Sequence, residues 1–368
     1  MDIQKLLKYA IESRASDLHL NADCHPVVRI DGELITLKDE ELLTEQSLFE
    51  LGEKLTTDKQ REVLHLKRQL DFAHVLPGVG RFRVSILMQR NALSFTFRVI
   101  AKDVNPLSNM GLPDIYATIT EAKKGLILVT GPTGSGKSTT LAAMVNYINE
   151  NDSRHIITVE DPIEYVHPNK KSMILQMEVG KDTDSFSQAL WSTLRHDPDV
   201  LVVGEMRDLE TISAAITAAE TGHLVMGTLH TNDATQTIDR IVDVFPHGQQ
   251  AQMRVQLAQV LVAVFSQLLI PRIGGGRIPA CEVMIANSAV RNSIREGKTQ
   301  FLQNAIQLGV KEKMQTMNQA LAKLVIEKVI TVKEALHYTP EKEQLTNLIG
   351  LKELIAKQGV GEKVAVLQ

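Results

Sequence analysis

The sequence predicts an α/β protein with two domains, a smaller α+β domain followed by a larger one built on a parallel sheet. Two observations predict the larger domain: a glycine-rich loop follows a short apolar run, and three later apolar runs each end in a polar side chain. A third observation predicts paired strands in the smaller domain, because residues 81–87 and 95–98 alternate strictly between polar and apolar.

The smaller domain comes first in the chain. Its alternating strands place Arg81 and Arg83 on the face opposite Phe82, and Arg98 opposite Phe95. Two paired strands therefore carry arginines on one surface, which is either a solvated face or a binding surface. The other elements expected here are a helix at residues 3–11, strands at 16–20 and 27–32 with a turn at Asp31-Gly32, a helix at 45–65, and an interdomain linker at 101–113.

The glycine-rich loop at residues 131–138 matches the phosphate-binding pattern G-x-x-x-x-G-K-[S/T] at every fixed position, between a predicted strand and a predicted helix. In such loops backbone N–H groups surround phosphate oxygens, and the helix N-terminus adds partial positive charge. We therefore expect a nucleoside triphosphate here, with Lys137 on the β- and γ-phosphates and the Ser138 hydroxyl on Mg²⁺. The expected nucleotide-binding residues are Gly131, Pro132, Thr133, Gly134, Ser135, Gly136, Lys137, Ser138 and Thr139.

Alternating strand and helix patterns after the loop predict a parallel sheet, whose ligands bind at the carboxyl ends of the strands. Glu160, Glu205 and His230 each follow an apolar run, so we expect them at the same edge as the loop. Each of them alone is equally consistent with a solvated strand end or a structural histidine.

Beside a phosphate loop, these side chains acquire roles in hydrolysis. Glu205 fits the acidic strand end called Walker B, although Gly204 stands where many such sites have Asp, so we expect Glu205 to act on Mg²⁺ through water. Glu160 is then expected to activate the attacking water, and His230 to sense the γ-phosphate.

The last part of the chain predicts a hairpin and then helices. Three glycines, at residues 274–276, separate two apolar runs and give the hairpin signal. Leu321, Leu324 and Val325 are expected in a core. The helices are expected at residues 288–296, 317–328, 332–337 and 341–357.

Composition limits the classes of function. The chain has 368 residues, a net charge of −4 and 4% aromatic residues, so it has no overall basic footprint for nucleic acid. Two distant cysteines, Cys24 and Cys281, exclude a disulfide framework and a four-cysteine zinc site, and favour a reducing cytosol. The longest apolar stretch, ending at Ile270, is interrupted by glutamines that include Gln267, so we expect membrane contact only through partners.

Taken together, these motifs resemble those of the secretion ATPase superfamily, and specifically of its type IV pilus retraction (twitching motility, PilT-like) branch. The matching segments are residues 131–138, 158–164, 204–208, 217–224 and 227–231. The resemblance implies a PAS-like N-terminal domain at residues 1–100, the linker at 101–113, a RecA-like ATPase domain at 114–286 and a helical C-terminal extension at 287–368.

The resemblance also implies an activity and its partners. It implies ATP hydrolysis with Mg²⁺ in a cytoplasmic homohexamer, with Arg83 and Arg98 reaching the nucleotide of a neighbouring subunit. The motor would act on an inner-membrane pilus platform protein and would lie at the inner membrane only through the pilus machinery. Residues 289–296 resemble the retraction signature, with Val290 and Ser293 departing from its usual Ile and Leu. In this segment Arg291, Arg295 and Glu296 are expected to contact a partner.

Three alternatives are weighed against this function. Pilus assembly and type II secretion ATPases usually carry a four-cysteine zinc motif and an extra N-terminal domain, and the sequence shows neither. A RecA-like nucleic-acid translocase is disfavoured by the charge and by the single tryptophan, Trp191, so no direct nucleic-acid contact is expected. A non-hydrolysing, nucleotide-gated interaction protein is disfavoured by the presence of both Glu160 and Glu205.

Overall fold

The computed structural model describes residues 1–30, 32–100 and 104–350, and it divides into two compact units. The first unit comprises Met1–Val104 and Pro162–Val166, and the second comprises Asn105–Asp161 and the chain from His167 onward. Part of the expected turn at Asp31, the start of the expected linker and the expected tail helix beyond residue 350 lie outside the described residues.

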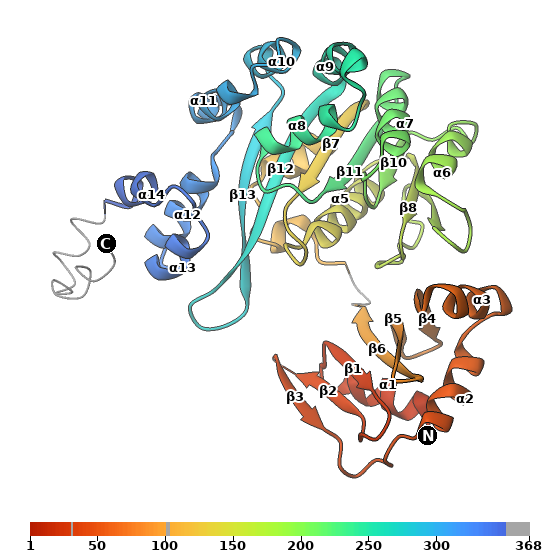
Figure 1. The fold of residues 1–368 in the computed structure, drawn as a ribbon. Coiled ribbons are helices and arrows are strands. Elements are labelled where there is room, and N and C mark those ends of the chain that lie inside the picture. Colours follow the sequence, from red (N-terminus) through yellow and green to blue (C-terminus); the bar gives the residue numbers. More distant parts are fainter. Residues whose placement is uncertain (31, 101–103, 351–368) are drawn as a thin grey trace, which may run out of the picture. The chain divides into compact units, whose positions relative to one another are not determined.

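The first unit contains a six-stranded antiparallel sheet with the order β3-β2-β1-β6-β5-β4 (Figure 1). The predicted alternation in β5 is confirmed, because Phe82, Val84 and Ile86 are fully buried in the core of this unit. The strands are β1 Asp17–Leu20, β2 Val27–Ile30, β3 Glu33–Thr36, β4 Gln69–Leu76, β5 Gly80–Gln89 and β6 Ala92–Ile100, and the first helix is α1 Ile3–Glu12.

The single helix expected over residues 45–65 is wrong, because the chain forms two helices, α2 Glu45–Leu55 and α3 Asp58–Lys67. Thr56 and Thr57 between them are extended, and both are β-branched. The Thr57 N–H donates to Gln60 Oε1 at 2.9 Å, and the Gln60 N–H donates to Thr57 Oγ1 at 3.4 Å. This capping box begins a new helix at Thr57, although the helical periodicity of the sequence continues through this position.

The second unit is built on a seven-stranded mixed sheet with the order β13-β12-β7-β11-β10-β8-β9. The predicted parallel arrangement of β7, β8, β10 and β11 is confirmed, and β9 and β12 extend it to six parallel strands. The last strand, β13, pairs antiparallel with β12. Every residue of β7 and β11 is buried, as expected of central strands with both faces covered. The strands are β7 Gly125–Thr130, β8 His155–Glu160, β9 Met173–Glu178, β10 Val200–Val203, β11 Leu224–Leu229, β12 Leu261–Pro271 and β13 Arg277–Ile285.

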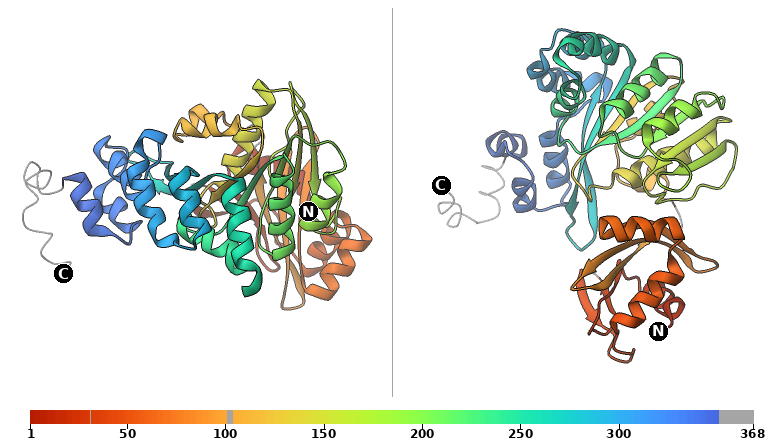
Figure 2. Two further views of the ribbon diagram at one scale, coloured as in Figure 1. Left: turned by 90° about the horizontal axis from the view of Figure 1, so that it is seen from above. Right: turned by 45° about the vertical axis from the view of Figure 1, so that its right-hand side comes forward.

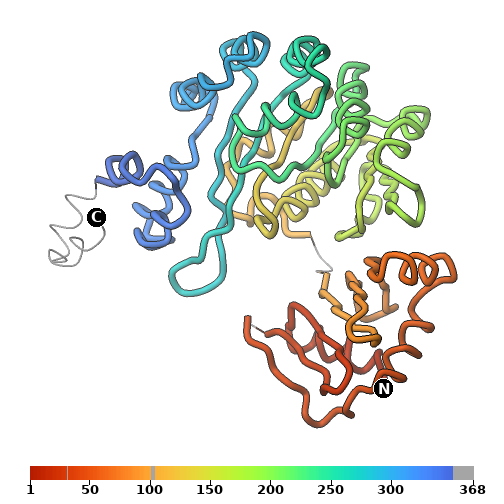
Figure 3. The backbone as a smooth tube through the Cα atoms, viewed as in Figure 1, coloured from red at the N-terminus to blue at the C-terminus, as the bar shows by residue number. Residues whose placement is uncertain are grey.

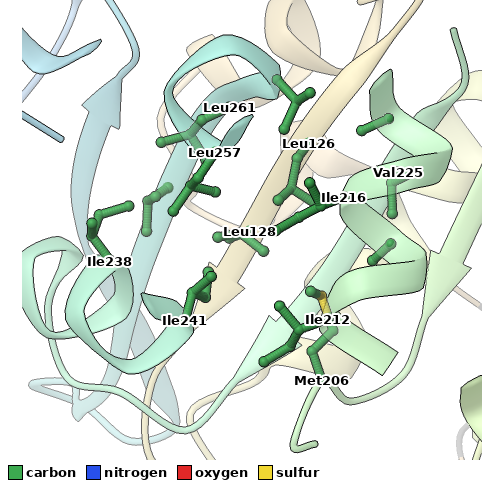
Figure 4. Packing of buried hydrophobic residues seen from close by; sticks show 14 of the residues in the cluster. Leu126, Leu128, Met206, Ile212, Ile216, Val225, Ile238, Ile241, Leu257 and Leu261 are labelled. Atoms are coloured by element: carbon green, nitrogen blue, oxygen red, sulfur yellow. The ribbon is translucent and has the colours of Figure 1, made fainter. Parts of the chain in front are cut away.

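Helices cover both faces of this sheet (Figures 1 and 2). On one face, Leu126 and Leu128 of β7 pack with Ile212 of α7 (Leu209–Glu220) and Leu257 of α9 (His247–Val260), as Figure 4 shows. On the other face, α5 (Lys137–Asn151) packs against β7 and β11. It also packs against α4 (Ile115–Thr120), whose Tyr116 ring stacks on Phe265 of β12. The further helices are α6 Phe186–Thr193, α8 Ala234–Asp243, α10 Ser288–Arg295, α11 Leu302–Leu308, α12 Met317–Ile326, α13 Val332–His337 and α14 Lys342–Ile349, with 3₁₀ turns η1 Leu107–Asn109, η2 Thr299–Phe301 and η3 Gly309–Glu312.

The predicted hairpin is formed by β12 and β13 and projects as a long loop of chain in Figure 3. Ile270 and Ala280 of this hairpin pack with the predicted core residues Leu321 and Val325 of α12. The helices of residues 317–349 therefore rest on the hairpin end of the sheet. Within the described ranges, no helix combines the length and the apolar character needed to cross a membrane.

Candidate active site

The phosphate loop lies between β7 and α5, at the carboxyl edge of the sheet. Gly131, Gly134 and Gly136 have φ values of 146°, 80° and 89°, which L side chains rarely adopt. A Cβ atom on Gly131 would lie 2.3 Å from the carbonyl oxygen of Gln267 and 2.6 Å from Ser135 Oγ. Glycine is therefore required both by the backbone conformation and by the close approach of β12.

The residues of this loop fit a bound phosphate group. The helix α5 begins after Gly136, and among the described residues no side chain caps its N-terminus. The N-terminus of a helix carries partial positive charge, which attracts anions. The Ser135 hydroxyl is buried, and no described residue forms a hydrogen bond with it. The buried Lys137 Nζ donates to the carbonyl oxygens of Gly131 at 2.8 Å and Pro132 at 3.1 Å. Lys137 is thus held at the loop, where a triphosphate would lie.

Gln267, known from the sequence only as an interruption of an apolar stretch, anchors the loop to β12. Its side chain is buried; Nε2 donates to the Ser135 carbonyl oxygen at 2.8 Å, and Oε1 accepts from Thr140 Oγ1 of α5 at 3.0 Å. The next strand residue back, Ser266, accepts a hydrogen bond from Thr130 at 2.9 Å. One amide therefore ties the loop and the helix to the sheet, and the signal that could have revealed it is a glutamine inside an apolar strand.

Three predicted site residues meet at the carboxyl edge. His230 Nε2 lies 2.8 Å from Glu205 Oε1, and His230 Nδ1 lies 3.4 Å from Lys137 Nζ. Glu205 also forms an ion pair with Arg207, and this hydrogen bond raises the pKa of the Arg207 guanidinium. The structure thus brings the phosphate loop, the Walker B carboxylate and the histidine together, and it adds Arg207, which the sequence analysis did not name.

The position before Glu205 is crowded against the neighbouring strand, where many such sites carry an aspartate. A Cβ atom on Gly204 would lie 3.2 Å from Glu160 Cα and 3.2 Å from the Val159 carbonyl oxygen, so a side chain would require the backbone of β8 to shift slightly. The Gly204 N–H donates to Val159 at 2.8 Å, and Thr228 Oγ1 donates to the Gly204 carbonyl at 2.5 Å. These bonds fix the chain that leads into Glu205.

Glu160 is the last residue of β8, which is the neighbour of β10 in the sheet. Its Oε1 accepts a hydrogen bond from Thr158 Oγ1 at 2.7 Å and another from Gln176 Nε2 of β9 at 3.1 Å. Glu160 therefore lies at the same edge as the other predicted residues, and its own donors come from β8 and β9. Neither Gln176 nor β9 was singled out in the sequence.

The two predicted arginines lie in the first unit. Arg83 of β5 and Arg98 of β6 are direct cross-strand neighbours, which confirms that both strands carry arginine on one surface. Arg83 Nη1 lies 3.8 Å from Glu164 Oε1, and Arg98 Nε donates to Asp17 Oδ1 at 2.9 Å. Each guanidinium thus has an acidic partner within its own unit.

The helix α10 contains the segment expected to contact a partner. Arg291 donates to the carbonyl oxygens of Ala258 and Gln259, the latter at 2.9 Å, at the C-terminal end of α9. Burial lowers the pKa of the Arg291 guanidinium. Arg291 is therefore half-buried and caps α9, whereas Arg295 is exposed and donates to Asn292 on its own helix. Contact of these arginines with a partner stays a prediction.

Comparison with known proteins places these observations in a family. Residues 1–350 match the family described as "Type II/IV secretion system protein". The "Type IV pilus retractation ATPase PilT" of Pseudomonas aeruginosa is 47% identical over 335 residues, covering 91% of this chain and 97% of that protein. The "Twitching motility protein" of Neisseria gonorrhoeae is 47% identical over 329 residues, covering 88% and 87%. A solved structure, "Crystal Structure of the Pilus Retraction Motor PilT and Bound ADP", gives a TM-score of 0.87 at 49% identity and covers 94% of this chain and 99% of that one.

Proposed function

Since the chain belongs to the family of type II/IV secretion system proteins, we propose that it is an ATP-hydrolysing motor that drives retraction of a type IV pilus. Similarity to a pilus retraction ATPase along 97% of that protein's length supports the proposal. The observation that carries it is the meeting of Lys137, Glu205 and His230 beside the phosphate loop.

In this proposal ATP is the substrate, and each site residue has one task. The loop from Gly131 to Thr139 and the N-terminus of α5 hold the phosphates, and Lys137 places its charge on the β- and γ-phosphates. Ser138 and, through water, Glu205 hold Mg²⁺, which neutralises phosphate charge when bound. Glu160 orients the attacking water, and His230, between Lys137 and Glu205, senses the γ-phosphate.

The finer architecture belongs to the same proposal. The first unit is taken as a PAS-like domain, supported by an antiparallel sheet with helices packed on it. The second unit contains a RecA-like ATPase domain at residues 114–286, supported by its parallel strands and phosphate loop, and a helical extension from residue 287.

The active form is taken as a homohexameric ring in which Arg83 and Arg98 act on the nucleotide of a neighbouring subunit. Their shared surface supports this role. In a test, Arg83→Ala/Arg98→Ala protein is mixed with Glu160→Gln/Glu205→Gln protein. Junctions between the two kinds of subunit then restore complete sites, so part of the ATPase activity should return. If mixed rings of verified mass stay inactive, the arginines act within their own chain.

The motor is taken to work in the cytoplasm, at the inner membrane through a pilus platform protein, without direct contact to nucleic acid or lipid. The exposed Arg295 on α10 is the candidate platform contact. In the organism that encodes the chain, deletion of its gene should leave excess pili and abolish twitching. Loss of pili would instead favour the pilus-assembly ATPase, and stimulation of hydrolysis by single-stranded DNA would favour a nucleic-acid translocase.

A further inference from the structure

We propose that Gln176 is a positioning residue that holds the Glu160 carboxylate in the orientation needed for hydrolysis. The proposal rests on the function proposed above for Glu160. Gln176 lies outside every motif of the sequence analysis, on β9 at the edge of the sheet. It reaches the site through the pairing of β8 with β9.

The register of these two strands explains why Gln176 meets Glu160. Gln176 lies directly opposite Thr158, and Glu160 lies two residues further along β8, so all three side chains leave the same face of the sheet. Gln176 Nε2 lies 3.1 Å from Glu160 Oε1. A glutamine side chain at this register is long enough to span the distance to the end of the neighbouring strand.

The orientation of the Gln176 amide follows from its contact with the backbone of His167. The backbone N–H of His167 can only donate, and it lies 2.9 Å from Gln176 Oε1. The oxygen of the amide therefore faces His167, and the NH₂ group faces the carboxylate. Both ends of the amide are used, so glutamine fits both partners, whereas glutamate would keep the acceptor for His167 and lose the donor for Glu160.

Two of the groups that contact Glu160 donate to the same carboxylate oxygen. Thr158 Oγ1 lies 2.7 Å from Glu160 Oε1, which also accepts from Gln176. Two donors from different strands restrict rotation of the carboxylate about its last bond and thereby set the direction of Oε2. A group that orients an attacking water requires such a fixed direction.

The test compares single and double variants of the assembled full-length protein. Gln176→Leu should lower kcat about 10-fold to 100-fold, the usual effect of removing a side chain that orients a functional group, with the KM for ATP within about twofold. In the Glu160→Gln background, the same change should have no further effect on single-turnover hydrolysis. Gln188→Leu, at an exposed position on α6, serves as the matched control and should hydrolyse ATP at the wild-type rate.

A second variant, Gln176→Glu, tests the same contact if Gln176→Leu fails to fold. Gln176→Glu keeps the acceptor for the His167 N–H and places a second carboxylate against Glu160, so it should fold and assemble yet lose kcat to a similar degree. Wild-type kcat in either folded variant would overturn the proposal. An equal fold-loss with and without Glu160 would overturn it too, since Gln176 would then act independently. Wild-type turnover of Glu160→Gln alone would contradict the proposed function itself.

Discussion

The two halves of the sheet edge that form the candidate site are held in different ways. Beside β7 and β12, the phosphate loop is hydrogen-bonded by the neutral amide of Gln267, a residue that is only 1% exposed. Beside β10 and β11, Glu205 contacts His230 and Arg207, whose side chains are 39% and 74% exposed. Buried hydrogen bonds with both partners satisfied fix one geometry, whereas exposed ion pairs are weak and rearrange easily. The half proposed to bind phosphate is thus held in one geometry, whereas the charged half can rearrange, as its proposed role in hydrolysis requires.

The largest effect is expected from Lys137→Ala on the phosphate-loop half. Removing the charge from the β- and γ-phosphates should lower the ATPase rate by at least about 100-fold. The fold should persist, which circular dichroism would verify. Lys181→Ala, at an exposed lysine of the same unit, is the control and should leave the rate unchanged. Normal turnover in Lys137→Ala would mean that the loop does not bind the reacting phosphates.

A change of similar chemistry on the charged half should separate binding from turnover. Glu205→Gln keeps the shape of the side chain and removes its charge, so ATP binding should remain while kcat falls by about 100-fold. Glu210→Gln, an exposed carboxylate at the start of α7, is the matched control. Nucleotide titration and steady-state hydrolysis of both proteins check this, and an unchanged kcat in Glu205→Gln would remove it from the catalytic group.

The sequence predicts best the features that depend on local patterns. The phosphate loop requires its glycines by backbone geometry, and alternation in β5 follows from one buried face, so both are visible without a partner. Two other features depend on tertiary packing. The helical periodicity of the sequence continues through Thr56, so it does not reveal that the helix ends there. Arg291 lies on a helix, as predicted, but only the packing of that helix shows that its side chain contacts α9.

The sequence did not reveal two residues of the site, Gln176 and Gln267, for a similar reason. Gln176 and Gln267 act through partners 16 and 132 residues away in the chain, so no spacing rule connects them to the motifs. Their function becomes visible only when strand order and register are known. Glu160, Glu205 and His230 were found because each lies at the end of an apolar strand, whereas Gln176 and Gln267 lie inside strands.

Removal of the loop anchor is expected to have an intermediate effect. Gln267→Leu leaves the Ser135 carbonyl and the Thr140 hydroxyl buried without this partner, which should lower the free energy of unfolding by about 2 to 4 kcal/mol. Nucleotide affinity should fall with it, because the loop loses its tie to β12. Gln259→Leu, exposed on α9, should change neither quantity. Chemical denaturation and nucleotide titration measure both, and wild-type values in Gln267→Leu would show that the loop holds its shape without β12.

The smallest expected effect is the pH dependence of the free energy of unfolding that arises from His167. This residue lies on the side of the site where its backbone contacts Gln176. Burial, together with the charge of Lys170, lowers the pKa of the His167 imidazole from its ordinary 6.5 to about 4. Between these values the unfolded chain binds a proton that the folded chain does not bind, so stability falls as the pH drops through this window.

The free energy of unfolding of the wild-type protein should therefore decrease by roughly 2 kcal/mol more between pH 7 and pH 5 than that of His167→Gln, which cannot titrate there. His247→Gln, at an exposed position, is the control and should follow the wild type. Denaturation curves at both pH values measure the difference. Parallel pH dependence of the wild type and His167→Gln would show that His167 accepts its proton without cost, and that this part of the edge is as open to water as the cluster of Glu205, Arg207 and His230.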